Sequence, residues 1–370
     1  MKLFCSKAEL QKSVNIVMKA VPAKTTMPIL ECILIDASTN DIKFTSNDME
    51  LGIETRVQGM VLEKGIIALD AKIFSEIVRK LPDSDVTIET DERLNTTITC
   101  EKAKFNIPGK SGEDFAYLPL IEKNECIRVS QFTLKEIIRQ TIFSIALNEN
   151  NKLMTGELFQ IEDNRLRVIS LDGHRISIRR VPLKEPCEDR KVIVPGKTLN
   201  EISKILSGEL EDMVDIYLSA NHILFEFDDT TVVSRLIEGE YFKIDQMLSS
   251  DYETKVKINK KEFLDCIDRA TLLVKEGDKK PIIINIEDGQ MELSIDSQIG
   301  SMKEDIDIEK EGKDIMIGFN PKFLIDALKV IDDEEISIYL MNPKAPCFIR
   351  DDEQQYIYLI LPVNFNAAGR

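Results

Sequence analysis

One amphipathic pattern occurs three times along the chain, in residues 69–81, 194–206 and 319–331. The lysine that opens the polar face of each copy lies 125 residues from its equivalent in the next copy. Apolar residues at positions i, i+3 and i+7 form one helical face, and two basic residues seven positions apart fall on the opposite face. Asp70 and Asn320 precede two of these runs, as N-capping residues should. We therefore expect three helices, each with one face in a core and a basic face exposed.

A second helical pattern follows a short predicted strand in each repeat, in residues 3–18, 127–142 and 256–271. In the second repeat the helix itself is predicted over 132–147. The apolar anchors at i, i+4 and i+7 are Leu10, Val14 and Val17, then Leu134, Ile138 and Thr141, and finally Phe263, Ile267 and Ala270. Repeats of fixed period predict a stacked or ring-like architecture, because neighbouring units complete one another's cores.

Alternating apolar and polar residues between the helices predict antiparallel strands. The clearest hairpin is predicted at Asp172-Gly173, between strands at 165–171 and 175–181. A continuous apolar run at 356–365 predicts a last strand that is buried on both sides.

Composition sets the class of protein. The chain has 370 residues, 43% of them hydrophobic and 31% charged, which fits two or three domains, and the repeat selects three. No apolar stretch approaches membrane-spanning length and the charged N-terminus does not resemble a secretory signal, so we expect a cytoplasmic protein. The seven cysteines include no C-x-x-C pair, which favours reduced thiols.

The net charge of -17 at pH 7 argues against a nucleic-acid partner, because phosphates would be repelled. Lysine and arginine nevertheless outnumber aspartate and glutamate over five of the six predicted helices. Solubility alone explains basic residues on any one helix. The same basic spacing in three helices favours a shared polyanionic partner.

Candidate catalytic motifs are weak. Gly109-Lys110-Ser111 and Gly196-Lys197-Thr198 resemble the tail of a phosphate-binding loop, but both lack the upstream glycine, so no nucleotide site is assigned. Asp172 and His174 suggest an orienting acid and a base, yet no nucleophile accompanies them, and structure or binding is favoured over catalysis. The two histidines are isolated, so we expect no metal and no cofactor.

Seven short segments spread over the chain form a further pattern: Thr26–Leu30, Ser46–Glu50, Asp172–Arg175, Val192–Pro195, Ser234–Gly239, Ile317–Asn320 and Tyr358–Val363. In this order, and on a triplicated chain, they resemble the beta subunit of the bacterial replicative DNA polymerase, the sliding clamp family.

The resemblance implies an α+β fold, the DNA clamp fold, with three like domains at 1–122, 126–250 and 254–366, each with two helices and two antiparallel sheets. Two chains would join head to tail into a homodimeric ring, with helices lining the hole and sheets outside. Such a ring encircles double-stranded DNA without reading its sequence. As a non-catalytic processivity factor it tethers the replicative polymerase, the clamp loader and repair polymerases through short linear motifs, and no membrane is involved.

Three groups of site residues follow from the helix pattern and the resemblance. The residues expected to face DNA are Lys12, Lys24, Lys72, Arg79, Arg139, Lys197, Lys204, Lys261, Lys322 and Lys329. Those expected to form a pocket for partner peptides are Met154, Leu171, Gly173, His174, Arg175, Ile176, Phe242, Gln246, Met247, Leu359, Ile360, Leu361, Pro362 and Val363. Those expected at the dimer interface are Lys102, Lys104, Leu272, Leu273, Glu304 and Asp305.

The chain departs from the family pattern in two places. Tyr241–Ile244 replaces the family's Phe-Pro-Asp-Tyr, which removes a proline from the pocket wall, and the residues Asn366–Arg370 extend the usual tail. Two other functions stay open at this point: a repeat scaffold that does not encircle DNA, and a nucleotide-dependent enzyme that uses some of the 65 acidic residues.

Overall fold

The computed structural model describes residues 1–148, 150–248, 251–275 and 280–365. The chain divides into two compact units: unit 1 is residues 1–135 with 197–236, and unit 2 is residues 136–196 with 237–370. Each unit is described by itself below. The end of the third predicted domain at residue 366 and the extension Asn366–Arg370 lie outside the described residues.

Unit 1 is built on one antiparallel sheet of 13 strands. In spatial order they are β10 (Cys126–Ser130), β15 (Met213–Leu218), β16 (His222–Phe227), β17 (Thr230–Arg235), β4 (Leu51–Val57), β3 (Ile42–Asn47), β2 (Cys32–Ala37), β6 (Gly65–Asp70), β9 (Ala103–Ser111), β8 (Asn95–Cys100), β7 (Asp85–Thr90), β1 (Lys2–Ser6) and β5 (Gly59–Glu63). Exposed and buried residues alternate along strands such as β7 and β8, as expected for strands with one face in a core.

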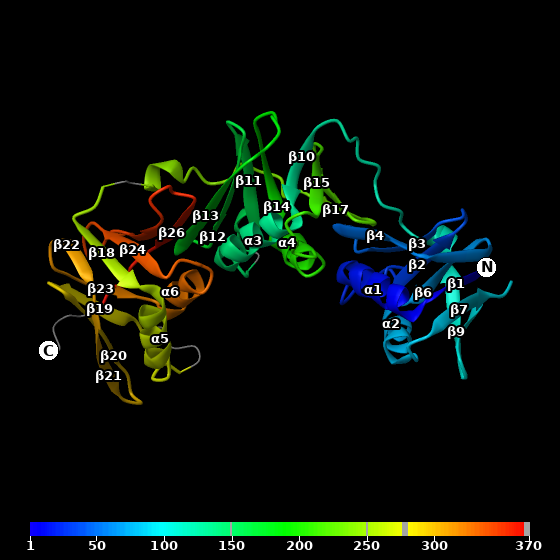
Figure 1. The fold of residues 1–370 in the computed structure, drawn as a ribbon, viewed down its shortest axis with the longest axis horizontal. Coiled ribbons are helices and arrows are strands. Elements are labelled where there is room, and N and C mark those ends of the chain that lie inside the picture. The colour runs from blue at the N-terminus through cyan, green and yellow to red at the C-terminus, as the bar shows by residue number, and fades with distance from the viewer. Residues whose placement is uncertain (149, 249–250, 276–279, 366–370) are drawn as a thin grey trace. The chain divides into compact units, whose positions relative to one another are not determined.

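Helices α1 (Lys7–Val17) and α2 (Ala71–Lys80) pack against each other in unit 1 (Figure 1). Each starts where a strand ends, and the last strand residue is the N-cap. Ser6 and Asp70 accept a hydrogen bond from the backbone N–H three positions later, at 3.2 and 2.8 Å. The apolar face of α2 is buried, with Phe74 fully enclosed.

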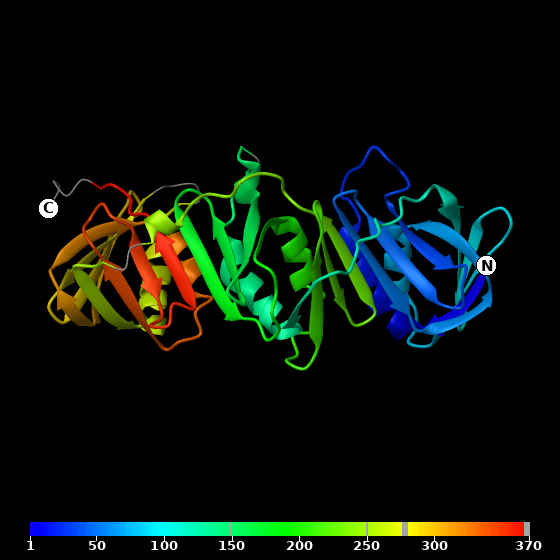
Figure 2. The same cartoon turned by 90° about the horizontal axis from the view of Figure 1, so that it is seen from above.

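Unit 2 contains two antiparallel sheets in its described residues. The nine-stranded sheet runs β14 (Arg190–Pro195), β11 (Gly156–Glu162), β12 (Arg165–Leu171), β13 (Arg175–Pro182), β26 (Tyr356–Ile360), β25 (Cys347–Arg350), β24 (Glu335–Leu340), β18 (Thr254–Asn259) and β22 (Glu309–Gly312). The four-stranded sheet runs β21 (Ser301–Asp307), β20 (Gln290–Asp296), β19 (Ile282–Glu287) and β23 (Ile315–Phe319). Helices α5 (Lys260–Thr271) and α6 (Pro321–Leu328) pack against each other (Figure 1), and their buried side chains form one apolar cluster with strands of both sheets. Figure 2 gives the view from above.

The two remaining helices, α3 (Gln131–Thr141) and α4 (Gly196–Ser203), each cross the division between the units. Short 3-10 turns complete the described helical structure: η1 (Met18–Ala20), η2 (Gly112–Asp114), η3 (Ile142–Ser144), η4 (Lys152–Thr155) and η5 (Asp245–Met247). The helix predicted over 132–147 is therefore too long. The chain tightens into η3 after Thr141, whose hydroxyl bonds back to the carbonyl of Ile137 at 2.7 Å.

Both large sheets continue from one repeat into the next through strand pairing. In unit 1, β17 pairs with β4, and Thr230 lies opposite Thr55. In unit 2, β26 pairs with β13, and Tyr356 lies opposite Arg179. We call these the two repeat joins. They explain why sheets expected in pairs for each domain merge into larger ones.

The predicted cores are confirmed. Every predicted anchor from Leu10 to Ala270 is buried, and the hairpin strands predicted at 165–171 and 175–181 are β12 and β13. The last strand is β26 and all of its residues are buried, but it stops at Ile360 rather than at residue 365, because Pro362 cannot continue the backbone hydrogen bonding.

Candidate functional site

A cavity of about 140 Å³ lies beside the turn between β12 and β13 in unit 2. We call it the turn cavity. It is lined by Met154, Leu171, Gly173, His174, Arg175, Ile176, Phe242, Ile244, Met247, Leu359 and Leu361. The structure thus brings together all of the expected pocket residues except Gln246, Ile360, Pro362 and Val363, and it adds Ile244.

The turn itself is fixed by Asp172. Its Oδ1 accepts the backbone N–H groups of His174 at 2.9 Å and Arg175 at 3.1 Å. Gly173 has a φ of 88°, a left-handed conformation that glycine adopts without strain. Because the Asp172 carboxylate bonds to the His174 backbone, this pair is the frame of a hairpin, and the alternative of an acid orienting a base is wrong.

Arg175 is fully engaged within unit 2. Its guanidinium donates to Asp172 at 3.0 Å, to Asp326 at 2.7 Å and to the carbonyl of Phe143 at 2.5 Å. It also lies 4.5 Å from the ring centroid of Phe323, on which the His174 ring stacks. These contacts therefore hold the Arg175 side chain in place in the wall of the turn cavity.

The segment 241–248 forms the second wall of the turn cavity, and the 3-10 turn η5 within it decides which side chains face the cavity. A 3-10 helix has about three residues per turn, so Ile244 and Met247 share one side and Gln246 points elsewhere. This is why Ile244 lines the turn cavity and Gln246 does not. The hydroxyl of Tyr241 donates to backbone carbonyls of Gly156 and Ile169 at 3.4 Å, and burial raises its pKa.

Strand β26 and Leu361, which follows it, form the third wall of the turn cavity. Along β26 side chains alternate between faces, so Leu359 lines the cavity while Ile360 is buried in the core on the other side. Leu361 is held by a hydrogen bond from its N–H to the carbonyl of His174 at 2.9 Å. Val363 instead donates to the carbonyl of Gly318 at 2.8 Å, which takes it away from the turn cavity.

The equivalent position at the other repeat join is filled. Asp48 builds the same turn as Asp172, and Met49, with a φ of 73°, lies in the same left-handed region as Gly173. A Cβ added to Gly52, which stands where Ile176 stands, would come within 2.1 Å of Leu118. Leu118 therefore occupies the space above Gly52 that the turn cavity leaves open above Ile176.

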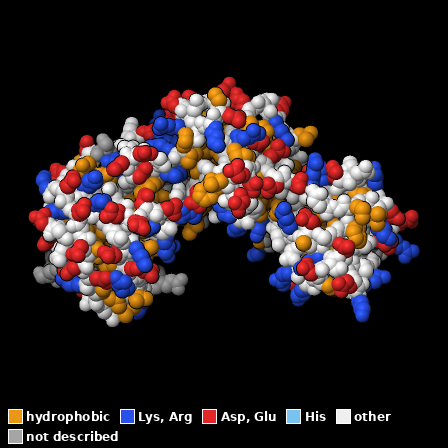
Figure 3. Space-filling view, viewed as in Figure 1, with side chains coloured by type: hydrophobic (Ala, Val, Ile, Leu, Met, Phe, Trp, Pro, Cys, Tyr) orange, Lys and Arg blue, Asp and Glu red, His pale blue; other side chains and the backbone are white. Residues whose placement is uncertain are grey.

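The expected DNA-facing residues lie on helices, apart from Lys24, Lys204 and Lys329, and all are exposed except the half-buried Arg139. Arg79, Arg139 and Lys204 pair with an acidic residue three positions earlier in the chain. Lys197 pairs with Asp48. Among the described residues no carboxylate lies within ion-pair distance of the others: Lys12, Lys24, Lys72, Lys261, Lys322 and Lys329. On the face viewed in Figure 3, acidic and basic side chains are interspersed.

The expected interface residues lie at two sheet edges. Lys102 and Lys104 are exposed at the start of β9, and Asp305 is exposed on β21, the last strand of its sheet. Glu304 is bound by Arg269 of α5, with Nε–Oε2 at 3.0 Å, and this hydrogen bond lowers its pKa. Leu272 is 77% exposed.

Of the other expected interface residues, Leu273 packs against the core. Exposed Phe105 and Ile299 beside these edges were not anticipated. The available signal was their position in the sequence, because Phe105 directly follows Lys104 and Ile299 lies within six residues of Glu304 and Asp305.

Several absences hold for the described residues. No helix in them is long and apolar enough to cross a membrane. No group of three or more His, Cys, Asp or Glu side chains there is placed to hold a metal ion. None of the seven cysteines, all of which are described, forms a disulfide bond.

Comparison with known proteins covers nearly the whole chain. Family models of the DNA polymerase III beta subunit match residues 1–119 (N-terminal domain), 128–243 (central domain) and 245–364 (C-terminal domain). A beta sliding clamp of Staphylococcus epidermidis is 35% identical over 360 residues, covering 94% of this chain and 95% of that protein.

Solved structures agree with this match. A putative DNA polymerase III beta subunit from Eubacterium rectale is 74% identical, with a TM-score of 0.96 over 99% of this chain and 100% of that chain. The DNA polymerase sliding clamp of Bacillus subtilis is 35% identical, with a TM-score of 0.95 over 99% and 100% of the two chains.

Proposed function

Because the chain belongs to the DNA polymerase III beta subunit family, the beta sliding clamps, we propose which of its residues hold DNA, close the ring and receive partners. The chain is a DNA sliding clamp and a processivity factor, and it is not catalytic. Two copies form a ring that encircles DNA and that the polymerase and the clamp loader bind. The full-length family match carries this conclusion, and the alternative of a scaffold without encirclement is not favoured.

The helix cations are the proposed DNA contacts. Lys12, Lys24, Lys72, Lys261, Lys322 and Lys329 are exposed and have no carboxylate within ion-pair distance among the described residues, so they are available for phosphate oxygens. Arg79, Arg139, Lys197 and Lys204 are already paired with carboxylates and would contact DNA more weakly. Contacts of this kind bind without sequence preference and weaken with salt.

We propose that the two subunits of the ring are joined by antiparallel strand pairing of the same kind as in the two repeat joins. In each join a backbone carbonyl closes the turn by accepting a hydrogen bond, that of Leu51 in unit 1 and that of Arg175 in unit 2. The fourth residue after Leu51 is Thr55, which lies opposite Thr230, the first residue of β17. The fourth residue after Arg175 is Arg179, which lies opposite Tyr356, the first residue of β26. Two strands without a neighbour on one side in the described chain fit the same pattern: β21, which follows the turn closed by Gly300, and β9 over residues 103–108.

The same rule gives the register between subunits. Ala103, the first residue of β9, would lie opposite Glu304 of the partner subunit. Lys102 then faces Asp305 of the partner subunit, which is a favourable cross-strand pair. Pairing these edges also removes two exposed strand edges that would otherwise invite aggregation. Exposed Phe105, Leu272 and Ile299 are proposed as the apolar part of this interface.

The turn cavity is proposed to receive a short linear motif of partner proteins. Its lining is almost entirely apolar, and Phe242 and Met247 at its rim are 38% and 48% exposed. A leucine or phenylalanine of an extended peptide would fill it, and the flexible Met154 and Met247 side chains would adapt to different partners. Gln246, Ile360, Pro362 and Val363 have no proposed contact with that side chain.

Location and domain bounds are proposals of the same kind. A protein that encircles chromosomal DNA in a bacterium works in the cytoplasm. Domains at 1–122 and 126–250 contain the first two family matches, whereas the third match begins at residue 245, before the proposed start of the last domain at 254–366. The compact units divide the middle range differently.

One experiment tests encirclement. The full-length protein is loaded by a clamp loader onto nicked circular DNA, and the bound fraction is followed by gel filtration before and after the circle is cut once. We expect retention on the circle and loss after cutting, because an encircling protein slides off an end. Equal retention on both forms would indicate ordinary surface binding and favour the scaffold.

A further inference from the structure

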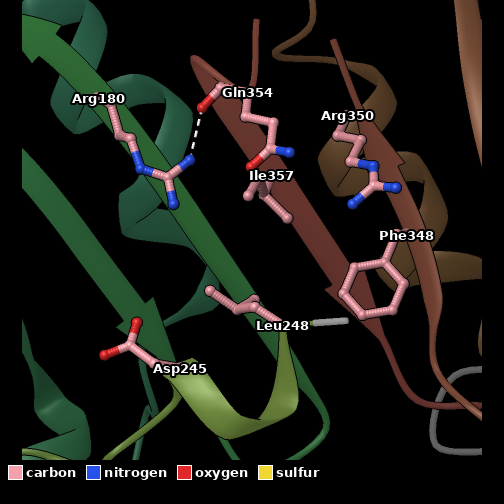
Figure 4. A pocket seen from close by; sticks show the side chains of 7 residues that line it. All are labelled: Arg180, Asp245, Leu248, Phe348, Arg350, Gln354 and Ile357. Atoms are coloured by element: carbon pink, nitrogen blue, oxygen red, sulfur yellow. Dashed lines mark hydrogen bonds between the residues drawn. The ribbon is translucent and has the colours of Figure 1, made fainter. Parts of the chain in front are cut away.

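A second cavity, of about 270 Å³, lies in unit 2 on the same face of the nine-stranded sheet as the turn cavity. It is lined by Arg180, Asp245, Leu248, Phe348, Arg350, Gln354 and Ile357 (Figure 4). We call it the arginine cavity. Figure 4 shows the Arg180 and Arg350 side chains on either side of Ile357, with Leu248 and Phe348 at the near side.

The arginine cavity lies next to the turn cavity on this face of the sheet. Ile357 and Leu359, which line one cavity each, belong to the same apolar cluster and are two residues apart on β26, a spacing of about 7 Å. The 3-10 turn η5 separates the cavities, with Ile244 and Met247 on one side and Asp245 on the other.

The arginine cavity has an excess of positive charge, because Arg180 and Arg350 line it together with one carboxylate, that of Asp245. A third arginine, Arg167, lies next to Arg180 outside the lining. Arg167 of β12 lies directly opposite Arg180 of β13, and like charges in such a pair repel. Arg167 donates through Nη1 to Asp245 at 2.9 Å, but the Asp245 side chain is 76% exposed. The Nε and Nη2 atoms of Arg167 are buried without a hydrogen-bond partner among the described residues. Such orphaned charged donors are costly, so the positive charge of Arg167 beside Arg180 is only partly compensated.

The Arg180 guanidinium is held in one orientation at the arginine cavity, in which it could bind an anion. Its Nη1 donates to the carbonyl of Gln354 at 2.6 Å, which fixes the guanidinium plane. Burial, and then the neighbouring charge of Arg167, lower the pKa of Arg180, so its local surroundings disfavour the positive charge. The Arg350 guanidinium stacks 4.4 Å from the ring centroid of Tyr339, which orients it at the opposite side of the cavity.

We propose that the arginine cavity binds an aspartate or glutamate side chain of the same partner peptide whose apolar residue fills the turn cavity. Arginine forks match the two oxygens of a carboxylate, and the apolar floor of Phe348 and Ile357 excludes water around them. Leu359 and Ile357 are two residues apart, and Ile176 and Arg180 are four residues apart on β13. An extended peptide therefore places its acid two to four residues from its apolar anchor. This inference rests on the proposed peptide function of the turn cavity.

The test is a series of short fluorescent peptides that carry a leucine-phenylalanine anchor and either Asp or Asn at one position, two to four residues on either side. Affinity for the full-length dimer is measured by fluorescence anisotropy at low and at high salt. We expect one position at which Asp binds about five- to tenfold more tightly than Asn, with the gain shrinking at high salt.

Substitutions test whether the tighter binding of the Asp peptide than of the Asn peptide depends on the arginine cavity. Arg180→Gln should abolish the Asp gain and leave the Asn peptide unchanged, whereas Arg179→Gln, one residue away on the opposite face of β13, should keep the gain. Asp245→Asn removes the competing carboxylate and should tighten the Asp peptide alone. Melting temperature and dimer content show that each variant is folded.

Three results would overturn the inference. If the Asn peptide binds but Asp adds nothing at any position, the arginine cavity takes no carboxylate. If phosphoserine alone improves binding, the ligand is a phosphate instead. If Arg180→Gln weakens both peptides equally, Arg180 is structural. Failure of every peptide to bind would instead reject the turn cavity, and this inference with it.

Discussion

Arg175 donates through Nη1 to the carboxylate of Asp326 at 2.7 Å, and this ion pair ties the turn between β12 and β13 to helix α6. Their side chains are only 9% and 24% exposed. Removing Asp326 leaves the buried Arg175 guanidinium with Asp172 as its remaining carboxylate partner and with one donor unsatisfied, so we expect Asp326→Ala to reduce the free energy of unfolding of unit 2 by about 2 kcal/mol. Urea denaturation followed by circular dichroism measures this. Glu76→Ala, which breaks an exposed helix pair with Arg79, is the control and should change stability by less than about 0.5 kcal/mol.

Leu361 offers the cleanest test of the turn cavity. Deleting the tail after Ile360 would also remove Phe365, which packs against Gly318, so a point change is preferable. We expect Leu361→Asp to weaken binding of a motif peptide at least tenfold, because a charge would be buried in an apolar cavity, while dimer content and retention on DNA stay unchanged. Calorimetric titration measures the affinity. Met60→Asp, at an exposed methionine on β5, is the matched control, and an equal loss in it would move the peptide site elsewhere.

The helix lysines are expected to set the salt dependence of DNA retention. Reversing Lys12, Lys72, Lys322 and Lys329 to Glu should shorten the lifetime of the loaded ring on nicked circles and flatten its dependence on salt. Each lost phosphate contact should reduce the slope by about one. Reversing Lys64, Lys184, Lys191 and Lys344, which are exposed outside the helices, changes the net charge equally and should have little effect. Equal effects of the two sets would mean that net charge, rather than position, controls retention.

The proposed subunit register predicts one specific cross-link. Lys104 should lie opposite Lys303 of the partner subunit, so a Lys104→Cys, Lys303→Cys protein should form intersubunit disulfides under mild oxidation. Ala103→Cys with Lys303→Cys is the control, because a shift of one residue places the two side chains on opposite faces of the sheet. Denaturing gels without reductant read the result. Preferential linking of the control pair would contradict the register.

Glu157 should make stability depend on pH. It is completely buried, and burial raises its pKa well above the ordinary value of 4.5. The folded protein therefore keeps a proton that the unfolded chain releases above about pH 4.5, so Glu157 lowers stability progressively as pH rises from that value towards the folded pKa. We expect Glu157→Gln to be more stable than the parent at pH 8, with the difference vanishing near pH 4. Melting temperatures across this range measure it, and Glu238→Gln, at an exposed residue, should show no such trend.

The sequence by itself determined the local structure, that is, the helices, their N-caps and the hairpin turn. The three-fold repeat, the buried anchors from Leu10 to Ala270, the N-caps Asp70 and Asn320 and the hairpin at Gly173 all depend on residues within a few positions of one another. Periodicity and capping act over that range, so the sequence determines them. Most of the proposed pocket residues were named in advance only because the chain resembles a known family.

Contacts between distant residues were decided by the tertiary structure. Ile244 lines the turn cavity and Gln246 does not, because a 3-10 turn rather than an extended segment crosses the sheet there. Arg175 became a buried support once α6 brought Asp326 to it, and Leu118 filled the space above Gly52 at the other repeat join. Glu304 was drawn to Arg269 within its own subunit. Each depends on strand register and on packing between segments many residues apart, which no local pattern encodes.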